Sequence, residues 1–107
     1  MISEIDPKEL KTRLDAGEDI LIVDVREEWE LRQSKVARAM HIPMDDIPTA
    51  LDRIPKDKPV VIMCHVGERS AQVVYWLRTK GYTNVYSLGG GISRWARDVD
   101  PSVVHRQ

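Results

Sequence analysis

The chain places an apolar run, VVIM at residues 60–63, directly before the loop CHVGERS at residues 64–70. A short apolar run bounded by loop residues predicts a buried strand. After the loop, residues 70–80 show the apolar periodicity of a helix, and Gly81 follows the basic residues that end it. These residues predict a strand, a tight loop and a helix in succession, with Cys64 at the carboxyl end of the strand.

Cys64 lies where the loop meets the start of the predicted helix, which is an electropositive position. The first turn of a helix has backbone N–H groups without partners, and a tight loop directs further N–H groups inward. Gly67 permits the backbone conformation that such a loop needs, and Arg69 adds a positive charge. Each feature favours the thiolate, the nucleophilic form of cysteine. The alternative interpretation is a small buried apolar side chain.

Length and composition indicate one ordinary globular domain, expected to span residues 1–107. Of the 107 residues, 42% are hydrophobic and 31% are charged, and the formal net charge is −1. This balance gives no reason to expect nucleic acid or a membrane surface as a partner. No apolar run approaches the roughly 20 residues that span a membrane, and the N-terminus lacks a signal-peptide pattern, so we expect a cytoplasmic protein. The single cysteine excludes an internal disulfide.

Strand and helix patterns alternate along the chain. The expected strands are residues 3–5, 20–25, 40–42, 60–63 and 85–88, and the expected helices begin near residues 7, 26, 47, 70 and 92. This alternation predicts an α/β fold with a five-stranded, mostly parallel sheet and helices on both faces. Ligands of such sheets bind beyond the carboxyl ends of the strands, which is where Cys64 lies.

Four motifs occur together and cover nearly the whole chain. They are LIVDVR at residues 21–26 followed by Glu28 and Trp29, AMHIP at residues 39–43, the loop at residues 64–70, and VYSLGGGI at residues 85–92 followed by Trp95. With these motifs in this order, the chain resembles a single-domain rhodanese, a protein of the thiosulfate sulfurtransferase family. The resemblance implies an enzyme that needs neither a cofactor nor a metal.

The resemblance also implies a reaction in two steps. The Cys64 thiolate takes a sulfane sulfur from thiosulfate or a persulfide and then passes it to cyanide, a small thiol or a protein. Asp24 and Arg26 are expected to support the site rather than to react. The residues expected to form the active-site loop, which binds the sulfur and any anion, are Cys64, His65, Val66, Gly67, Glu68, Arg69 and Ser70.

Two loop residues bear on the choice of donor. Glu68 departs from the basic or neutral residue that thiosulfate users often have there, and its carboxylate disfavours a dianionic donor. Arg69 either holds the shape of the loop or binds an anionic donor, and we favour the first interpretation. His65 is expected to face solvent, because one cysteine and three scattered histidines do not make a metal site.

Further side chains have less specific interpretations. We expect Trp29, Trp76 and Trp95 in the core or in a pocket wall. The glutamates at residues 27, 28 and 30 are expected on a solvated face. The glycines at residues 89–91 lack the Lys and Ser or Thr of a phosphate loop, so close packing beside the active-site loop is expected instead.

Three other functions compete with general sulfur transfer. Phosphatases and arsenate reductases of related fold have a longer loop than the four residues that separate Cys64 from Arg69, and the shorter ring suits one sulfur atom better. A non-catalytic interaction module is the second alternative, but inactive rhodanese domains usually lack the cysteine. The third is delivery of sulfur to a sulfur-carrier protein, because residues 95–102 resemble rhodanese domains fused to enzymes that activate such carriers.

Overall fold

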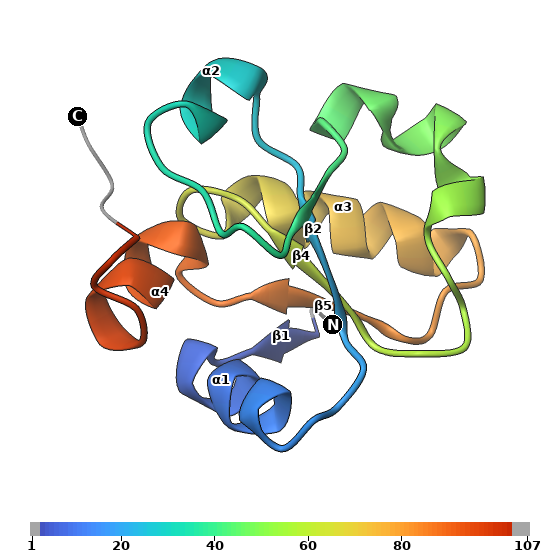
Figure 1. Cartoon of the computed structure of the whole chain (residues 1–107). Coiled ribbons are helices and arrows are strands. Elements are labelled where there is room, and N and C mark those ends of the chain that lie inside the picture. Colours follow the sequence, from blue (N-terminus) through green and yellow to red (C-terminus); the bar gives the residue numbers. More distant parts are fainter. Residues whose placement is uncertain (1–2, 104–107) are drawn as a thin grey trace.

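A parallel sheet of five strands forms the middle layer of the structure, a computed structural model that describes residues 3–103 (Figure 1). The strands lie in the order β1-β5-β4-β2-β3, and every pairing is parallel. Their bounds are Glu4–Ile5 (β1), Leu21–Asp24 (β2), Met40–His41 (β3), Val60–Met63 (β4) and Val85–Leu88 (β5). The expected sheet is therefore confirmed, with the strand that precedes Cys64 at its centre.

Helices cover both faces of this sheet (Figure 1). Helices α1 (Pro7–Asp15) and α4 (Gly91–Asp98) pack on one face. Helix α3 (Glu68–Thr79) packs on the other face together with two 3-10 helices, η1 (Met44–Thr49) and η2 (Leu51–Arg53). The short helix α2 (Glu28–Leu31) follows β2 and lies beside the start of α3. Within residues 3–103, no helix is long and apolar enough to cross a membrane.

The alternation of side chains along β4 determines the face on which each one packs. Val60 and Ile62 belong to the buried cluster under α3, whereas Val61 and Met63 belong to the cluster under α1 and α4. A strand that is covered on both sides needs an uninterrupted apolar run, which is what this segment supplies. Cys64 continues the alternation after Ile62 and joins the cluster under α3.

The expected α-helix at residues 47–54 is wrong, because this segment forms η1 and η2 instead. Pro48 lies inside η1, where it has no N–H to donate and its ring obstructs an α-helical bond. Ala50, at φ −120°, then separates the two 3-10 helices. Ile47 and Ile54 are nevertheless buried, so the apolar spacing predicted the burial correctly although the helix type differs.

The other expected elements are confirmed to within two residues at their ends. The largest consequence of these shifts concerns α3, which begins at Glu68 rather than at Ser70. Residues 1–2 and 104–107 of the expected domain lie outside the described residues.

A buried ion pair fixes the end of β2. Arg26 is 0% exposed and Asp24 is 1% exposed, and the guanidinium donates to the carboxylate from Nε at 3.0 Å and from Nη2 at 2.9 Å. Arg26 Nη2 also donates to the carbonyl oxygen of Ser34 at 2.8 Å, and His41 Nε2 donates to the carbonyl oxygen of Arg26 at 2.7 Å. The pair therefore joins the end of β2 to β3 and to the chain that follows α2.

Replacing Asp24 with alanine leaves the Arg26 guanidinium buried without a counter-charge. We expect the free energy of unfolding of Asp24→Ala, measured by urea denaturation, to fall by about 3–5 kcal/mol. The matched control is Asp19→Ala, because Asp19 pairs with Lys58 at the surface and 82% of its side chain is exposed. Exposed pairs contribute about 0–1 kcal/mol. Equal losses in the two variants would contradict the role given to the buried pair.

Candidate active site

The sulfur of Cys64 lies at the bottom of the loop that joins β4 to α3. Sγ accepts hydrogen bonds from the backbone N–H of Gly67 at 3.0 Å and of Ser70 at 3.3 Å. The hydroxyl of Ser70 lies 3.4 Å from the same sulfur, and the Cys64 residue is 1% exposed. Donors directed at one atom favour a negative charge on it, so this geometry favours a thiolate.

The sulfur also occupies the position of a cap at the start of α3. Gly67 is the N-cap residue, with φ 106°, and it has no side chain that could accept from the free N–H groups of the first turn. Because α3 begins at Glu68, the N–H of Ser70 is one of these groups, and it donates to Cys64 Sγ. The partial positive charge of the helix start therefore acts directly on the candidate nucleophile.

The glycine segment after β5 holds the loop from its other side. The N–H of Ile92 donates to the carbonyl oxygen of Cys64 at 2.8 Å, and that of Ser93 to the carbonyl oxygen of His65 at 3.1 Å. A Cβ on Gly91 would lie only 2.5 Å from the oxygen of Cys64 and 2.3 Å from that of His65. The expected close packing is thus present. This packing ties the two carbonyl groups to α4, while the N–H groups of Gly67 and Ser70 face the sulfur.

The guanidinium of Arg69 is bound by a carboxylate rather than left free. Its Nη1 and Nη2 donate to the two oxygens of Glu30 at 2.7 Å and 2.8 Å. Hydrogen bonds from Arg69 lower the pKa of Glu30 from 4.5 to about 2, and the carboxylate in turn raises the pKa of Arg69. Glu30 also accepts from the backbone N–H of Glu27 at 2.9 Å. Arg69 thereby joins the start of α3 to α2.

Two expectations for α2 are wrong. Glu30 is 6% exposed and does not lie on a solvated face, whereas Trp29 is 58% exposed and does not lie in the core. Neighbouring residues of a helix point in different directions, so a helix that turns Glu30 inward turns Trp29 outward. The sequence did contain one signal that Glu30 binds within the protein, because Glu27 and Glu30 have the spacing of a capping box. Of the other tryptophans, Trp95 is buried and Trp76 is half-buried, as expected.

The remaining predicted site residues lie around the loop in different roles. Val66 and Glu68 are exposed at its outer side, and His65 is half-buried rather than facing solvent fully. Asp24 lies in the strand beside Met63, and its buried pair with Arg26 supports that edge of the sheet. Within residues 3–103, no group of three or more His, Cys, Asp or Glu side chains is arranged to hold a metal ion.

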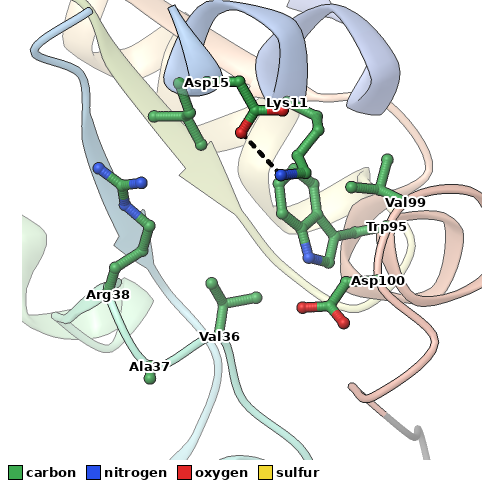
Figure 2. Close-up of a pocket in the computed structure, with 9 residues that line it drawn as sticks. Lys11, Asp15, Val36, Ala37, Arg38, Trp95, Val99 and Asp100 are labelled. Atoms are coloured by element: carbon green, nitrogen blue, oxygen red, sulfur yellow. Dashed lines mark hydrogen bonds and ion pairs between the residues drawn. The ribbon is translucent and has the colours of Figure 1, made fainter. Parts of the chain in front are cut away.

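A cavity of about 460 Å³ lies apart from this loop, between α1, α4 and the segment before β3 (Figure 2). Figure 2 shows the ring of Trp95 on one side of it, Arg38 on the opposite side and the ion pair of Lys11 with Asp15 at its edge. Trp95 belongs to the buried cluster under α1 and α4, whereas Cys64 belongs to the cluster on the other face. The cavity is therefore separate from the chemistry of the cysteine.

Comparison with known proteins gives one consistent result. The rhodanese-like domain family matches residues 6–98. The chain is 44% identical over 103 residues to a sulfurtransferase from Allochromatium vinosum, with 96% of each chain covered. It is 35% identical over 77 residues to the thiosulfate sulfurtransferase GlpE from Coxiella burnetii, with 72% of each covered. The crystal structure of a rhodanese-like domain protein from Staphylococcus aureus matches with a TM-score of 0.84 at 32% identity, covering 99% of this chain and 100% of that one.

The ion pair between Glu30 and Arg69 should make stability depend on pH. Because folding lowers the pKa of Glu30 from 4.5 to about 2, the pair stabilises the folded state above pH 4.5 and loses this effect as the pH falls through 2. We expect Glu30→Gln to lower the free energy of unfolding by about 2 kcal/mol at neutral pH, with the difference disappearing at the acid end. Urea denaturation across this pH range measures it.

The control for this prediction is Glu28→Gln, since Glu28 pairs with Arg32 and 76% of its side chain is exposed. This variant should remain within about 0.5 kcal/mol of the parent at every pH. A Glu30→Gln variant whose deficit stays constant down to pH 2 would show that its effect does not come from the ion pair.

Proposed function

Because the chain belongs to the rhodanese-like domain family and is a sulfurtransferase, we propose that Cys64 is the residue that carries the transferred sulfur. The observation that supports this best is the hydrogen bonding of its Sγ by the N–H groups of Gly67 and Ser70. No other residue of the chain is a cysteine, so an enzyme-bound persulfide has one possible position. We assign residues 1–107 to a single rhodanese domain.

In the first step, the Cys64 thiolate attacks the outer sulfur of the donor. A bond forms between Sγ and that sulfur, and the sulfur–sulfur bond of the donor breaks. The remainder of the donor leaves with the electron pair, as sulfite from thiosulfate or as a thiolate from a persulfide. The N–H groups of Gly67 and Ser70 stabilise the thiolate that makes this attack.

In the second step, a nucleophilic acceptor attacks the outer sulfur of the Cys64 persulfide. The bond between this sulfur and Sγ breaks, and Cys64 leaves again as a thiolate. The same two N–H groups therefore stabilise Sγ as the nucleophile of one step and as the leaving group of the other. No redox cofactor is needed, because in each step one sulfur–sulfur bond breaks while one new bond to the transferred sulfur forms.

The burial of the sulfur limits what can reach it. Cys64 is 1% exposed, so an acceptor has to approach with a narrow nucleophile such as cyanide, a thiolate or the end of an extended protein tail. Because an extended tail fits this narrow approach, delivery of sulfur to a sulfur-carrier protein is the second candidate function. A non-catalytic role of the domain is the third, and the mass measurement below distinguishes it.

We assign Arg69 to holding the loop and Glu68 to influencing the choice of donor. The ion pair with Glu30 already satisfies the Arg69 guanidinium, which reduces its capacity to bind a donor anion. Glu68 is the first residue of α3 and is exposed beside the loop. Its negative charge disfavours the dianion thiosulfate more than it disfavours a persulfide of lower charge.

Intact-mass measurement tests the role of Cys64. After incubation with thiosulfate or with a small-molecule persulfide, we expect the parent protein to gain the mass of one sulfur atom and then to lose it when cyanide or a thiol is added. Cys64→Ser should fold but gain no sulfur and transfer none, because an alcohol does not form the persulfide. Transfer by Cys64→Ser, or no gain of sulfur by the parent from either donor, would refute the assignment.

Reversing the charge at Glu68 tests its effect on the donor. We expect Glu68→Lys to raise kcat/KM for thiosulfate about threefold to tenfold, and the gain should shrink at high ionic strength because salt screens exposed charges. The matched control is Glu9→Lys, which makes the same change of net charge on α1, an element of the opposite helical layer. Unchanged or slower thiosulfate turnover by Glu68→Lys would count against the charge argument.

A further inference from the structure

A second serine lies behind the one that contacts the nucleophile. Ser87, on β5, is 0% exposed, and its Oγ lies 2.7 Å from Oγ of Ser70. Val85 of the same strand packs in the cluster under α3, and the two-residue alternation of a strand puts Ser87 on that face as well. The three polar atoms therefore form a buried row, from Ser87 through Ser70 to the sulfur of Cys64.

The number of protons in this row fixes the direction of the bond between the serines. Within residues 3–103, Ser70 is the one group that forms a hydrogen bond with the Ser87 hydroxyl. If Ser70 donated to Ser87, the proton of Ser87 would be buried without an acceptor, and an unsatisfied buried donor is more costly than an unused lone pair. Ser87 therefore donates and Ser70 accepts.

This direction leaves the proton of the Ser70 hydroxyl available for another acceptor. Two acceptors are in reach, the carbonyl oxygen of Gly67 at 3.2 Å and the sulfur of Cys64 at 3.4 Å. While Cys64 is a thiol, its S–H can donate to Ser70 Oγ and the Ser70 hydroxyl can donate to Gly67. Once the sulfur is a thiolate, a rotation of the hydroxyl gives it a third donor beside the two N–H groups.

We infer that Ser87 is a positioning residue for sulfur transfer: by donating to Ser70 Oγ, it holds this oxygen beside Cys64 Sγ and polarises its O–H group, so that the Ser70 hydroxyl stabilises the Cys64 thiolate. This inference rests on the proposed function, because it gives the two serines a role only if the thiolate is the reacting form. It applies to both steps, since Sγ carries negative charge before it attacks the donor and again when it leaves the persulfide. Ser87 itself does not touch the reacting atoms.

The test follows the rate of Cys64 alkylation by iodoacetamide as a function of pH, in the full chain. We expect Ser70→Ala to move the midpoint of this profile upward by about 0.5–1 pH unit, the effect of one hydrogen bond to the thiolate. Ser87→Ala should move it in the same direction by a smaller amount, because the Ser70 hydroxyl loses the donor that holds and polarises it. In the Ser70→Ala background, Ser87→Ala should cause no further shift, because Ser87 acts through Ser70. Ser102→Ala is the control, since Ser102 is exposed after α4, outside the loop and its supports, and should leave the midpoint unchanged.

Thermal unfolding of the same variants gives an independent readout. Ser70→Ala strands the buried Ser87 hydroxyl, so the double variant should unfold at the same temperature as Ser70→Ala or at a higher one. An unchanged midpoint in Ser87→Ala, or shifts that simply add in the double variant, would overturn the inference. Alkylation reports on the thiol whether or not it transfers sulfur. A failure of the proposed function would instead appear as transfer by Cys64→Ser.

Discussion

The hydrogen bond from the Ser70 N–H to Cys64 Sγ is the interaction on which the site depends. It makes one sulfur atom both the cap of α3 and the proposed nucleophile, so the same N–H group stabilises the start of a helix and favours a thiolate. The rest of the structure keeps these two atoms together. The central strand β4 fixes the position of the cysteine, and α4 holds the carbonyl groups of Cys64 and His65.

The positive potential around the sulfur comes mainly from backbone dipoles rather than from a free cation. Arg69 is the charged residue of the loop that would attract anions, but both of its terminal nitrogens donate to Glu30. Backbone N–H groups act over a short range and in a fixed direction, so they stabilise a single atom at the bottom of the loop. A free guanidinium would instead attract any anion near the entrance. This arrangement suits the transfer of one sulfur atom.

The sequence was most informative where local pattern and tertiary environment agree. The apolar run at residues 60–63, the cysteine after it and the helix that follows were predictable, because a strand covered on both faces needs this composition. Pro48 disrupted a helical apolar pattern, so the burial was predictable but the helix type was not. In α2, one helical turn was too short for periodicity to separate Glu30 from Trp29. Ser87 acquires its partner only because α3 packs over β5, a tertiary contact that no local pattern contains.

The close approach of Gly91 to the carbonyl oxygens of Cys64 and His65 has a consequence for how this family can diversify. The path of the loop is matched to a glycine segment more than twenty residues further along the chain. A longer loop, of the kind that encloses a tetrahedral phosphate, has to keep these two oxygens in place or lose their bonds to the start of α4. An insertion that preserves this contact has to fall after His65, between the held carbonyl groups and the first turn of α3.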